Sequence, residues 1–369
     1  MRLLVVTNDF PPTVGGIENY IYSLVRRWPA RDVVVLTRAV DGAEAFDAQQ
    51  SFEIVREPVN TLLPTPRLVQ KARKLLVDRD IEAVHFPSAL PLGLMARSLD
   101  APYVLSVHGG EFLLASRLPL ARRALRAVCG SASIILPEST FADQLVGRVL
   151  GEGVARRRLT CGVDIDRYLP GAVDAVDLGV GGPVVACVSR LVARKGPRTL
   201  LRALPRVSEH VEDVHLLIVG DGPDREPLEK MAQALGIAGS VTFAGKQPWE
   251  RIPAYLAAAD VFALPTRTRF FGTETEGLPL VYLEAAAAGL PMIGGDAGGV
   301  SDAVREGETG FIVDGRRPEQ VADSLLRLLR DPDLAAGMGA AARKMAEEEF
   351  GWDGLFHQYR DAVLTYCRR

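Results

Sequence analysis

Short, continuous apolar runs separated by helix-length segments are the feature that most constrains how this chain folds. Five runs lie in the first 140 residues, at 3–7, 33–37, 83–86, 103–108 and 133–137. Five more follow at 184–189, 215–220, 241–245, 261–265 and 291–295. Strands that are apolar throughout are buried on both faces, which is typical of parallel sheets covered by helices. The pattern predicts an α/β protein made of two doubly wound, Rossmann-like domains.

The series of runs is interrupted once, by a stretch rich in Asp, Gly and Pro. With 369 residues the chain exceeds one ordinary hydrophobic core, so two domains are expected. We predict an N-terminal domain over residues 1–165, a linker over 166–183, a C-terminal domain over 184–351 and a terminal helix over 352–369. Two domains of this type are expected to face a cleft, because doubly wound folds bind ligands at the carboxyl ends of their strands.

Composition excludes several classes of protein. Apolar residues make up 48% and charged residues 24% of the chain, as in soluble globular proteins. A net charge of −3 gives no general attraction to nucleic acid. The four cysteines have no CxxC spacing, so we expect reduced thiols and no metal site. No apolar run approaches about 18 residues, and residues 1–7 are too short for a signal peptide, so a cytoplasmic location is expected.

Two glutamates flank the expected start of a helix within EGLPLVYLE. Glu276 precedes this start, and Glu284, eight residues later, lies inside the expected helix. Pro279 favours a first helical turn, so a change from loop to helix is expected near Leu278. Amide groups at a helix start have no partner inside the helix and can bind an anion. The predicted ligand contacts of this stretch, besides the glutamates, are Gly277, Leu278, Leu280 and Val281.

Two cations follow the apolar run at 184–189, in the sequence SRLVARKG. Arg190 and Lys195 would leave the carboxyl end of this strand in the same direction. Such a pair is often only a solvated basic turn. Together with the helix start and the two glutamates, however, it suits a molecule with phosphate at one end and hydroxyl groups at the other. A nucleotide sugar has this chemistry.

Two further positions follow strands of the first domain. Gly15 and Gly16 lie in the loop at 8–17 and allow close approach of the backbone, to a diphosphate or to a sugar. An ordinary tight turn explains these glycines equally well, and no GxGxxG dinucleotide motif is present. His108 ends the run at 103–108 and precedes two glycines, which favours a position at the cleft over one in the core.

The glutamate pair, the upstream Arg and Lys, and the opening NDFPP…GGI resemble the retaining enzymes of glycosyltransferase family 4. Among them the chain is most similar to the actinobacterial phosphatidylinositol mannosyltransferases. The resemblance covers nearly the whole chain and implies the GT-B fold, with the helix at 352–369 packed on the first domain. It implies transfer of a hexosyl group with retention, from GDP-mannose to a phosphatidylinositol-type lipid acceptor, without a metal ion.

The resemblance also implies roles for individual residues. Arg190 and Lys195 would stabilise the leaving diphosphate, Glu276 would bind sugar hydroxyls, and Glu284 would bind the ribose. The side chain of His108 would lie against the donor sugar. The nucleotide base would lie over Gly220, Gly222 and the loop at 245–252, which includes Gln247. Two residues depart from the family pattern: Pro279 replaces a glycine, and Cys161 stands where Asn or Ser is usual.

Alternatives to this function remain open on the sequence. A glycosidase needs two carboxylates at one oxygen, whereas the helix offset spreads Glu276 and Glu284 along an extended ligand. Other candidates are a UDP-sugar transferase with a soluble or polysaccharide acceptor, a nucleotide-sugar epimerase, and a nucleotide-sugar binder without catalysis. The sequence identifies neither the linkage formed nor the oligomeric state.

Contact with the inner face of the cell membrane is a further hypothesis. The helix expected at 66–80 combines basic and apolar residues, and residues 117–126 carry four arginines and no acid. Either segment could instead be a solvated helix face, because basic amphipathic helices are common and only some bind anionic lipid.

Overall fold

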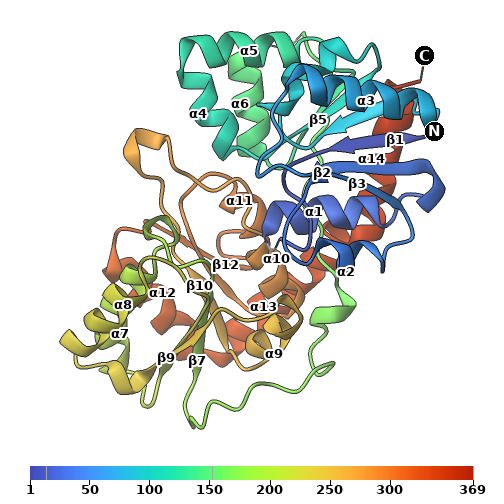
Figure 1. The fold of residues 1–369 in the computed structure, drawn as a ribbon. Coiled ribbons are helices and arrows are strands. Elements are labelled where there is room, and N and C mark those ends of the chain that lie inside the picture. Colours follow the sequence, from blue (N-terminus) through green and yellow to red (C-terminus); the bar gives the residue numbers. More distant parts are fainter. Residues whose placement is uncertain (14, 152, 369) are drawn as a thin grey trace. The chain divides into compact units, whose positions relative to one another are not determined.

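The computed structural model of the chain describes residues 1–13, 15–151 and 153–368, without the side chains of Glu111 and Phe271. Val14, in the glycine-containing loop, and Arg369 therefore lie outside the described residues. The chain divides into two compact units (Figure 1). Unit 1 comprises Met1–Cys161 and Trp352–Arg369, and unit 2 comprises Gly162–Gly351. The range predicted as a linker, 166–183, belongs to unit 2, and the terminal helix belongs to unit 1.

Each unit contains a parallel sheet of six strands, which confirms the predicted fold class. The order in unit 1 is β3-β2-β1-β4-β5-β6, with β1 at Leu3–Val6, β2 at Val33–Arg38, β3 at Glu53–Glu57, β4 at Ala83–Phe86, β5 at Tyr103–Val107 and β6 at Ile134–Pro137. The order in unit 2 is β12-β11-β10-β7-β8-β9, with β7 at Val184–Val188, β8 at His215–Val219, β9 at Val241–Gly245, β10 at Val261–Leu264, β11 at Met292–Gly295 and β12 at Gly310–Val313.

In both sheets the strand order reverses next to the first strand. The reversal lies between β1 and β4 in unit 1 and between β7 and β10 in unit 2. In open α/β sheets this reversal separates the loops that follow the two strands and leaves a crevice at their carboxyl ends. All ten predicted apolar runs form strands. The structure adds the edge strands β3 and β12, which the sequence analysis missed.

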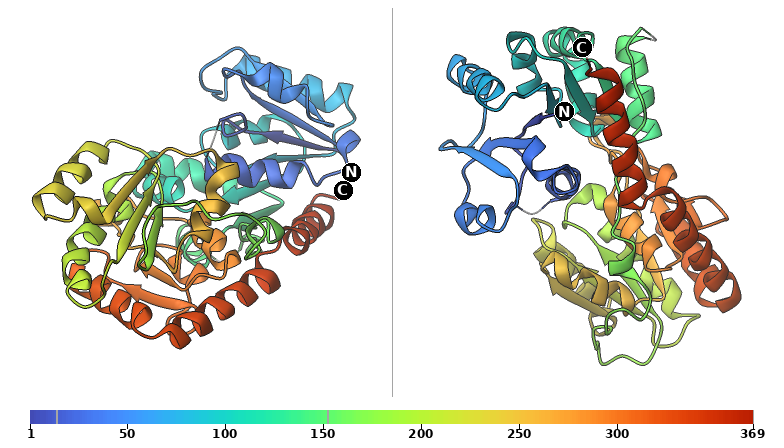
Figure 2. Two further views of the ribbon diagram at one scale, coloured as in Figure 1. Left: turned by 90° about the horizontal axis from the view of Figure 1, so that it is seen from below. Right: turned by 90° about the vertical axis from the view of Figure 1, so that its right-hand side faces the viewer.

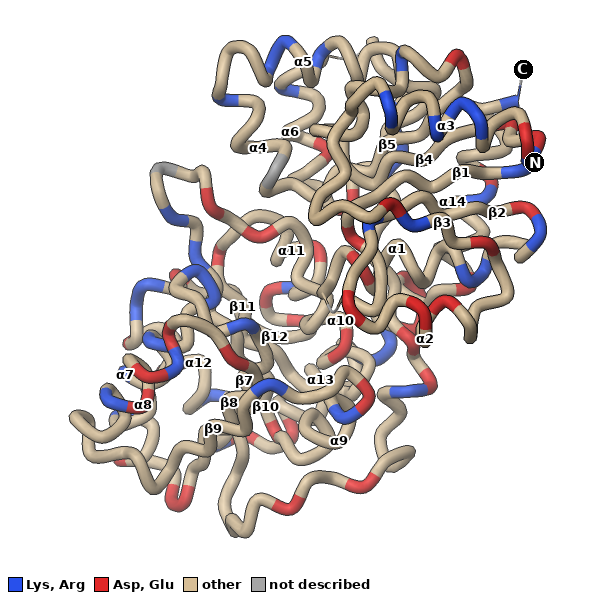
Figure 3. Tube along the Cα trace, viewed as in Figure 1, with Lys and Arg blue, Asp and Glu red and all other residues tan. Residues whose placement is uncertain are grey.

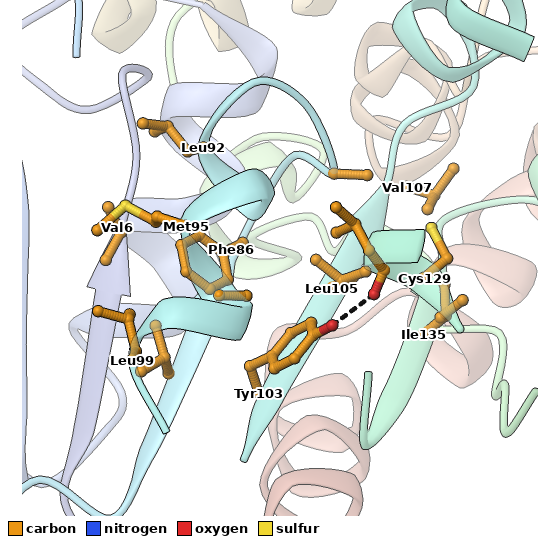
Figure 4. Close-up of a cluster of buried hydrophobic side chains, with 14 of the residues drawn as sticks. Val6, Phe86, Leu92, Met95, Leu99, Tyr103, Leu105, Val107, Cys129 and Ile135 are labelled. Carbon is orange, nitrogen blue, oxygen red and sulfur yellow. Dashed lines mark hydrogen bonds between the residues drawn. The ribbon is translucent and has the colours of Figure 1, made fainter. Parts of the chain in front are cut away.

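Helices cover both faces of the sheet in unit 1, and period-two alternation along the strands determines which residues meet them. Val6, Tyr103 and Leu105 belong to a core that also contains residues of helices α3 (Pro66–Asp78), α5 (Pro119–Cys129) and α6 (Thr140–Leu150) and of the 3-10 helix η2 (Leu92–Ser98). Figure 4 shows part of this core, where the Tyr103 hydroxyl donates a hydrogen bond to the Val128 carbonyl. Truncating a fully buried aromatic residue in such a core, such as Phe86, costs about 3–5 kcal/mol.

The opposite face of this sheet is covered by α1 (Gly16–Val25) and α14 (Trp352–Tyr366), which lie side by side (Figures 1 and 2). Aromatic rings connect the two segments: Tyr20 of α1 packs against Trp352, and Trp28, which follows α1, packs edge-on against Tyr359. Tyr359 also binds a buried histidine of β4, because its hydroxyl lies 2.8 Å from His85 Nδ1. Unit 1 also contains α2 (Ala43–Asp47), α4 (Gly110–Arg117) and the 3-10 helix η1 (Ala30–Asp32).

Unit 2 has the same layered design. Its α-helices are α7 (Pro197–Ser208), α8 (Arg225–Ala234), α9 (Ile252–Ala257), α10 (Leu280–Ala287), α11 (Val300–Ala303), α12 (Pro318–Leu329) and α13 (Pro332–Glu349). Its 3-10 helices are η3 (Asp166–Tyr168), η4 (Ala193–Lys195), η5 (Ala238–Ser240), η6 (Trp249–Arg251) and η7 (Phe270–Gly272). Among these, η4 follows β7, while η7 and α10 follow β10, so all three lie at the point where the strand order reverses.

Candidate active site

The centre of the candidate site in unit 2 is a buried carboxylate held by two cations. Glu276 is 6% exposed. Lys195 Nζ lies 2.8 Å from Glu276 Oε2, and Arg194 Nε lies 2.7 Å from Glu276 Oε1. Arg194 also approaches Glu274, with 3.7 Å between Nη1 and Oε1. A buried carboxylate loses hydration, and the two adjacent cations compensate for that loss.

The strand order explains how residues about 80 positions apart meet. Lys195 ends the turn after β7, and Glu276 precedes the helix after β10. Because β7 and β10 are adjacent parallel strands, both segments emerge at the same edge of the sheet. Gly196 makes this arrangement possible, since it has φ +79° and a Cβ there would lie 2.0 Å from the Pro265 carbonyl oxygen.

Arg190 lies apart from this ion-pair cluster. Its side chain is exposed and forms no ion pair with any residue that the structure describes. The structure therefore brings Lys195 to Glu276 and leaves Arg190 on the surface of the same turn. Sequence reasoning missed Arg194, although it stands beside Lys195, because only the folded turn shows that both side chains reach Glu276.

Glu276 precedes α10 and Glu284 lies within it, as predicted. The helix begins at Leu280, so Pro279 is the residue before the helix rather than its first residue. Gly277 and Leu278 complete the loop, and the Leu278 side chain is buried. The Tyr282 amide bonds to the Pro279 carbonyl at 3.1 Å, which leaves the amides of Leu280 and Val281 as the groups without an intrahelical partner. These two amides are the ones that the sequence analysis assigned to an anion.

Glu284 has a separate environment formed by the start of unit 2 and the turn after β9. Shielding from water raises the pKa of its carboxyl group, and the neighbouring Tyr168 hydroxyl, Arg167 and Trp249 oppose this rise. The Arg167 guanidinium stacks 3.2 Å from the centroid of the Trp249 ring and donates to the Trp249 carbonyl at 3.0 Å. The second glutamate thus lies beside an aromatic surface that the sequence analysis did not recognise.

The glycines predicted to lie under the base have a structural reason of their own. Gly220 has φ +130°, and a Cβ there would meet the Ser189 carbonyl oxygen at 1.9 Å. A Cβ at Gly222 would lie 2.4 Å from the Leu191 carbonyl oxygen. The turn after β8 therefore packs directly on the turn that carries Lys195. Gln247 is half-buried and its amide donates to the Ala244 carbonyl at 2.6 Å.

In unit 1, the predicted glycines begin the helix α1. Gly16 is its first residue, and Gly15 precedes it in an extended conformation with φ −178°. The Glu18 side chain folds back over Gly15, where a Cβ would lie 2.2 Å from Glu18 Oε2. Burial raises the pKa of Glu18 although a backbone hydrogen bond opposes the rise. An anion placed at this helix start would meet a carboxyl group that already occupies it.

His108 follows β5 and is paired with an acid that the sequence analysis missed. Its Nδ1 atom lies 2.6 Å from Glu138 Oε2, and both side chains are buried. Glu138 follows β6, the neighbouring strand. No sequence motif marks this pair, because it depends on the register of β5 and β6, in which Val107 lies beside Pro137.

The chemistry available in unit 2 is that of binding phosphate and hydroxyl groups. Arginine, lysine and free amides at a helix start bind phosphate oxygens, and carboxylates accept hydrogen bonds from hydroxyls. Over the described ranges, no three His, Cys, Asp or Glu side chains gather in a way that could hold a metal ion.

Comparison with protein families identifies both halves of the chain. Residues 14–167 match the model of Glycosyltransferase Family 4, and residues 175–345 match that of Glycosyl transferases group 1. Solved structures with the same fold include Anabaena Alr3699/HepE in complex with UDP, with a TM-score of 0.83 and 20% identity over 99% of this chain and 100% of that one. Sucrose-phosphate synthase from Thermosynechococcus elongatus has a TM-score of 0.83 and 22% identity over 99% of this chain and 98% of that one.

Curated relatives are similar over almost the full length. The GDP-mannose-dependent alpha-(1-6)-phosphatidylinositol monomannoside mannosyltransferase of Mycobacterium tuberculosis is 39% identical, over 98% of this chain and 97% of the relative. The GDP-mannose-dependent monoacylated alpha-(1-6)-phosphatidylinositol monomannoside mannosyltransferase of Corynebacterium glutamicum is 35% identical over 95% of each chain. The chain therefore belongs to glycosyltransferase family 4 and is a nucleotide-sugar glycosyltransferase.

Proposed function

We propose that this enzyme transfers a mannosyl group, with retention, from GDP-mannose to a phosphatidylinositol-type lipid acceptor. The observation that carries the proposal is the 39% identity over 98% of the chain to a relative named for this donor and a mannosylated phosphatidylinositol acceptor. Relatives from Mycolicibacterium smegmatis and Corynebacterium glutamicum, at 39% and 35% identity, are also named as GDP-mannose-dependent enzymes acting on phosphatidylinositol monomannoside or its monoacylated form.

Different residues of unit 2 bind different parts of the donor. Lys195 and Arg190 bind the diphosphate, together with the amides of Leu280 and Val281 at the start of α10. Glu276 accepts hydrogen bonds from hydroxyls of the sugar, and Glu284 accepts them from the ribose. The base lies over Gly220, Gly222 and Gln247. Supporting this division, Lys195 and Glu276 are in direct contact, so a sugar bound to the acid lies next to the cation that receives its phosphate.

Transfer breaks one bond at the sugar and makes another on the same face. The bond between the anomeric carbon and the β-phosphate oxygen breaks and leaves an oxocarbenium-like sugar, while an acceptor hydroxyl oxygen bonds to that carbon. The leaving phosphate takes the hydroxyl proton, and GDP departs. Preorganised cations on the phosphate stabilise the charge that develops there, and such groups contribute on the order of 10²–10³ in rate. Because Arg190 and Lys195 supply this charge, we propose that no metal ion is required. His108 would lie against the donor sugar.

A panel of donors tests the assignment. GDP-mannose, GDP, UDP-glucose and UDP are compared by thermal shift, since a ligand at about 100 times its dissociation constant adds roughly 2.7 kcal/mol to the stability of the folded state. We expect stabilisation by the two GDP compounds at concentrations where the UDP compounds have no effect. Stabilisation by the UDP compounds alone would reject GDP-mannose in favour of a UDP-sugar.

The acceptor has a second candidate. The D-inositol 3-phosphate glycosyltransferase of Rhodococcus opacus is 33% identical over 75% of this chain and 63% of the relative, and its name contains a soluble inositol phosphate. Incubation with radiolabelled GDP-mannose therefore uses phosphatidylinositol monomannoside in one arm and inositol 3-phosphate in another. Label extracted into organic solvent supports the lipid acceptor, whereas label confined to a water-soluble product supports the alternative.

A membrane surface is part of the proposal for a lipid acceptor, and the structure favours the α4–α5 surface over α3. On α3 the apolar residues other than Val77 pack into or against the core, and Lys71 and Lys74 lie 3.7 and 2.8 Å from Glu57 and Asp78. On α4–α5, apolar side chains remain exposed, at 52% for Leu114, 55% for Leu118 and 85% for Leu120. These leucines accompany the arginines of the acid-free segment 117–126, where basic positions recur along α5 (Figure 3). Exposed leucines beside arginines suit an anionic lipid surface.

Liposome flotation distinguishes the two surfaces. Leu120→Ser is compared with Val77→Ser, a matched change at a 77% exposed residue of α3. We expect Leu120→Ser to reduce recovery with anionic vesicles at low salt and Val77→Ser to leave it unchanged. The reverse pattern would move the contact to α3, and no binding by the unaltered enzyme would remove it. Among the helices that the structure describes, none is both long and apolar enough to cross a membrane.

A further inference from the structure

The acid Glu138 is built into the same edge of the unit 1 sheet as His108. The two residues follow the adjacent parallel strands β5 and β6, directly after the paired residues Val107 and Pro137. Their side chains are 4% and 7% exposed, and 2.6 Å separates His108 Nδ1 from Glu138 Oε2. Both groups gave up hydration to form this pair. The fold, and not a chance contact, therefore holds the carboxylate against the imidazole.

The pair determines which ring nitrogen of His108 carries the proton. A carboxylate oxygen accepts hydrogen bonds, so Nδ1 is the donor in this pair. In the neutral ring Nε2 then holds a lone pair and accepts a hydrogen bond from a hydroxyl. A carboxylate in this position also fixes the orientation of the ring, as the partner acid of a catalytic histidine does in other enzymes.

A second donor shares the same carboxylate oxygen. The Cys161 thiol lies 3.6 Å from Glu138 Oε2, and burial followed by the nearby Glu138 raises the pKa of Cys161 well above its usual range. The thiol is therefore a neutral, weak donor. Asn or Ser, which are more usual at this position in the family, would donate more strongly and draw charge away from the oxygen that holds His108.

Two further titratable groups among the described neighbours of His108, Tyr20 and His85, have pKa values shifted toward their uncharged forms. The Tyr20 ring meets the imidazole edge-on with 5.4 Å between centroids, and burial raises the pKa of its hydroxyl well above the usual range. His85 is a buried neighbour whose pKa is lowered to about 3, first by burial and then by His108. Its ring is fixed between Ser106 and Tyr359, at 2.9 and 2.8 Å.

We propose that Glu138 is a positioning residue for glycosyl transfer, which holds His108 with its proton on Nδ1 so that Nε2 accepts a hydrogen bond from a hydroxyl of the donor sugar. Cys161 moderates this effect through the shared oxygen. The inference rests on the proposed function, because the proposed function is what places His108 at the donor sugar.

Glu138→Gln tests the pair with almost no change in shape. The Gln amide can donate to Nδ1, which favours the opposite tautomer with the proton on Nε2. In full-length enzyme labelled with ¹⁵N-histidine, we expect His108 to be protonated on Nδ1 in the parent and to shift toward Nε2 in the variant. The His108→Asn spectrum assigns the signal among the five histidines. We expect kcat to fall by roughly 10- to 100-fold with KM for GDP-mannose nearly unchanged.

A double-mutant cycle separates positioning from structural support. If Glu138 acts through His108, Glu138→Gln should have no further effect on kcat once His108 is Asn. Glu57→Gln is the matched control, because Glu57 is a buried acid of unit 1 at 8% exposure and lies on β3, and its kcat should equal that of the parent. Glu138→Asp, which keeps the charge and shortens the side chain, replaces Glu138→Gln if that variant does not fold, and it should retain the Nδ1 tautomer with an intermediate kcat.

Three results of these experiments would contradict the positioning role of Glu138. An Nε2-protonated His108 in the parent, an unchanged tautomer in Glu138→Gln, or a changed tautomer with parental kcat would each overturn the proposal. Equal losses from Glu138→Gln with and without His108 would assign Glu138 a structural role only. Failure of the proposed function is recognised separately: the parent enzyme would then transfer no sugar from GDP-mannose, while the spectra would still report on the Glu138–His108 pair.

Discussion

Lys195 and Arg194 provide a matched pair of perturbations for the diphosphate assignment. Each makes one ion pair with Glu276, at 2.8 and 2.7 Å, so Lys195→Met and Arg194→Met remove equivalent support from the same acid. They differ in the proposal, because only Lys195 also binds the phosphate. GDP contains the diphosphate but no mannosyl group, so its affinity reports on the phosphate contact without the contact between Glu276 and the hydroxyls of the transferred sugar.

The expected size of the effect follows from one charge-assisted hydrogen bond. Such a bond contributes about 1.5–3 kcal/mol. At about 1.4 kcal/mol for each factor of ten, Lys195→Met should weaken GDP binding by roughly 10- to 100-fold. Arg194→Met should leave the Kd for GDP within about threefold of the parent. Both variants should lower kcat/KM for GDP-mannose, because Glu276 loses a partner, but Lys195→Met should lower it more, on the order of 10²–10³-fold.

Isothermal titration calorimetry with GDP and initial rates with GDP-mannose measure the two quantities. The melting temperature serves as the internal control. Each variant leaves the buried Glu276 with one cation instead of two, and Arg194→Met also removes the contact with Glu274, so Arg194→Met should destabilise unit 2 at least as much as Lys195→Met. Equal Kd values for GDP in the two variants would show that Lys195 serves only to hold Glu276 and would refute the phosphate assignment.

Three further predictions concern other parts of unit 2. Shielding from water raises the pKa of Glu284, so the folded state binds this proton more tightly, and stability present at low pH is lost as pH rises through the raised pKa. Glu284→Gln should therefore increase the melting temperature at neutral pH more than at pH 4. An equal change at both pH values would contradict this. Gly220→Ala places a Cβ 1.9 Å from the Ser189 carbonyl oxygen at φ +130°, and it should lower the free energy of unfolding in urea by roughly 2–6 kcal/mol. Gly236→Ala is the control and should cost much less, because φ is +71° there and the space is open. Activity should persist within about twofold after EDTA treatment, because Arg190 and Lys195 carry the phosphate charge, and a loss above tenfold that Mg²⁺ restores would assign that charge to a metal.

The sequence predicted most of the sheet architecture because buried parallel strands have a simple signature. The central strands are continuous apolar runs, and all ten predicted runs form strands. The two missed strands lie at sheet edges. β3 reads EIVRE and is half-buried along most of its length, while β12 is the four-residue GFIV. The charged residues at three of the five positions of β3 and the short length of β12 kept both strands from standing out as apolar runs.

The candidate site was predicted unevenly, for a geometric reason. Glu276, Glu284 and Lys195 belong to local patterns, a helix start and a strand end, which sequence can reveal. Arg194 and Glu138 act through partners 82 and 30 residues away, and their importance depends on strand order and register. The structure also changes the view of Arg190, which lies exposed on the turn while Lys195 reaches Glu276.

The departure at Pro279 illustrates why a family pattern must be examined in the fold. A proline in place of glycine removes one backbone donor, and at a phosphate-binding turn that loss would matter. In this chain Pro279 precedes the helix, with φ −70° and ψ 109°, and its carbonyl accepts the Tyr282 amide. The amides of Leu280 and Val281 come after it and keep their hydrogens. The missing donor therefore lies outside the first turn of α10, and the anion-binding groups proposed for the diphosphate do not depend on it.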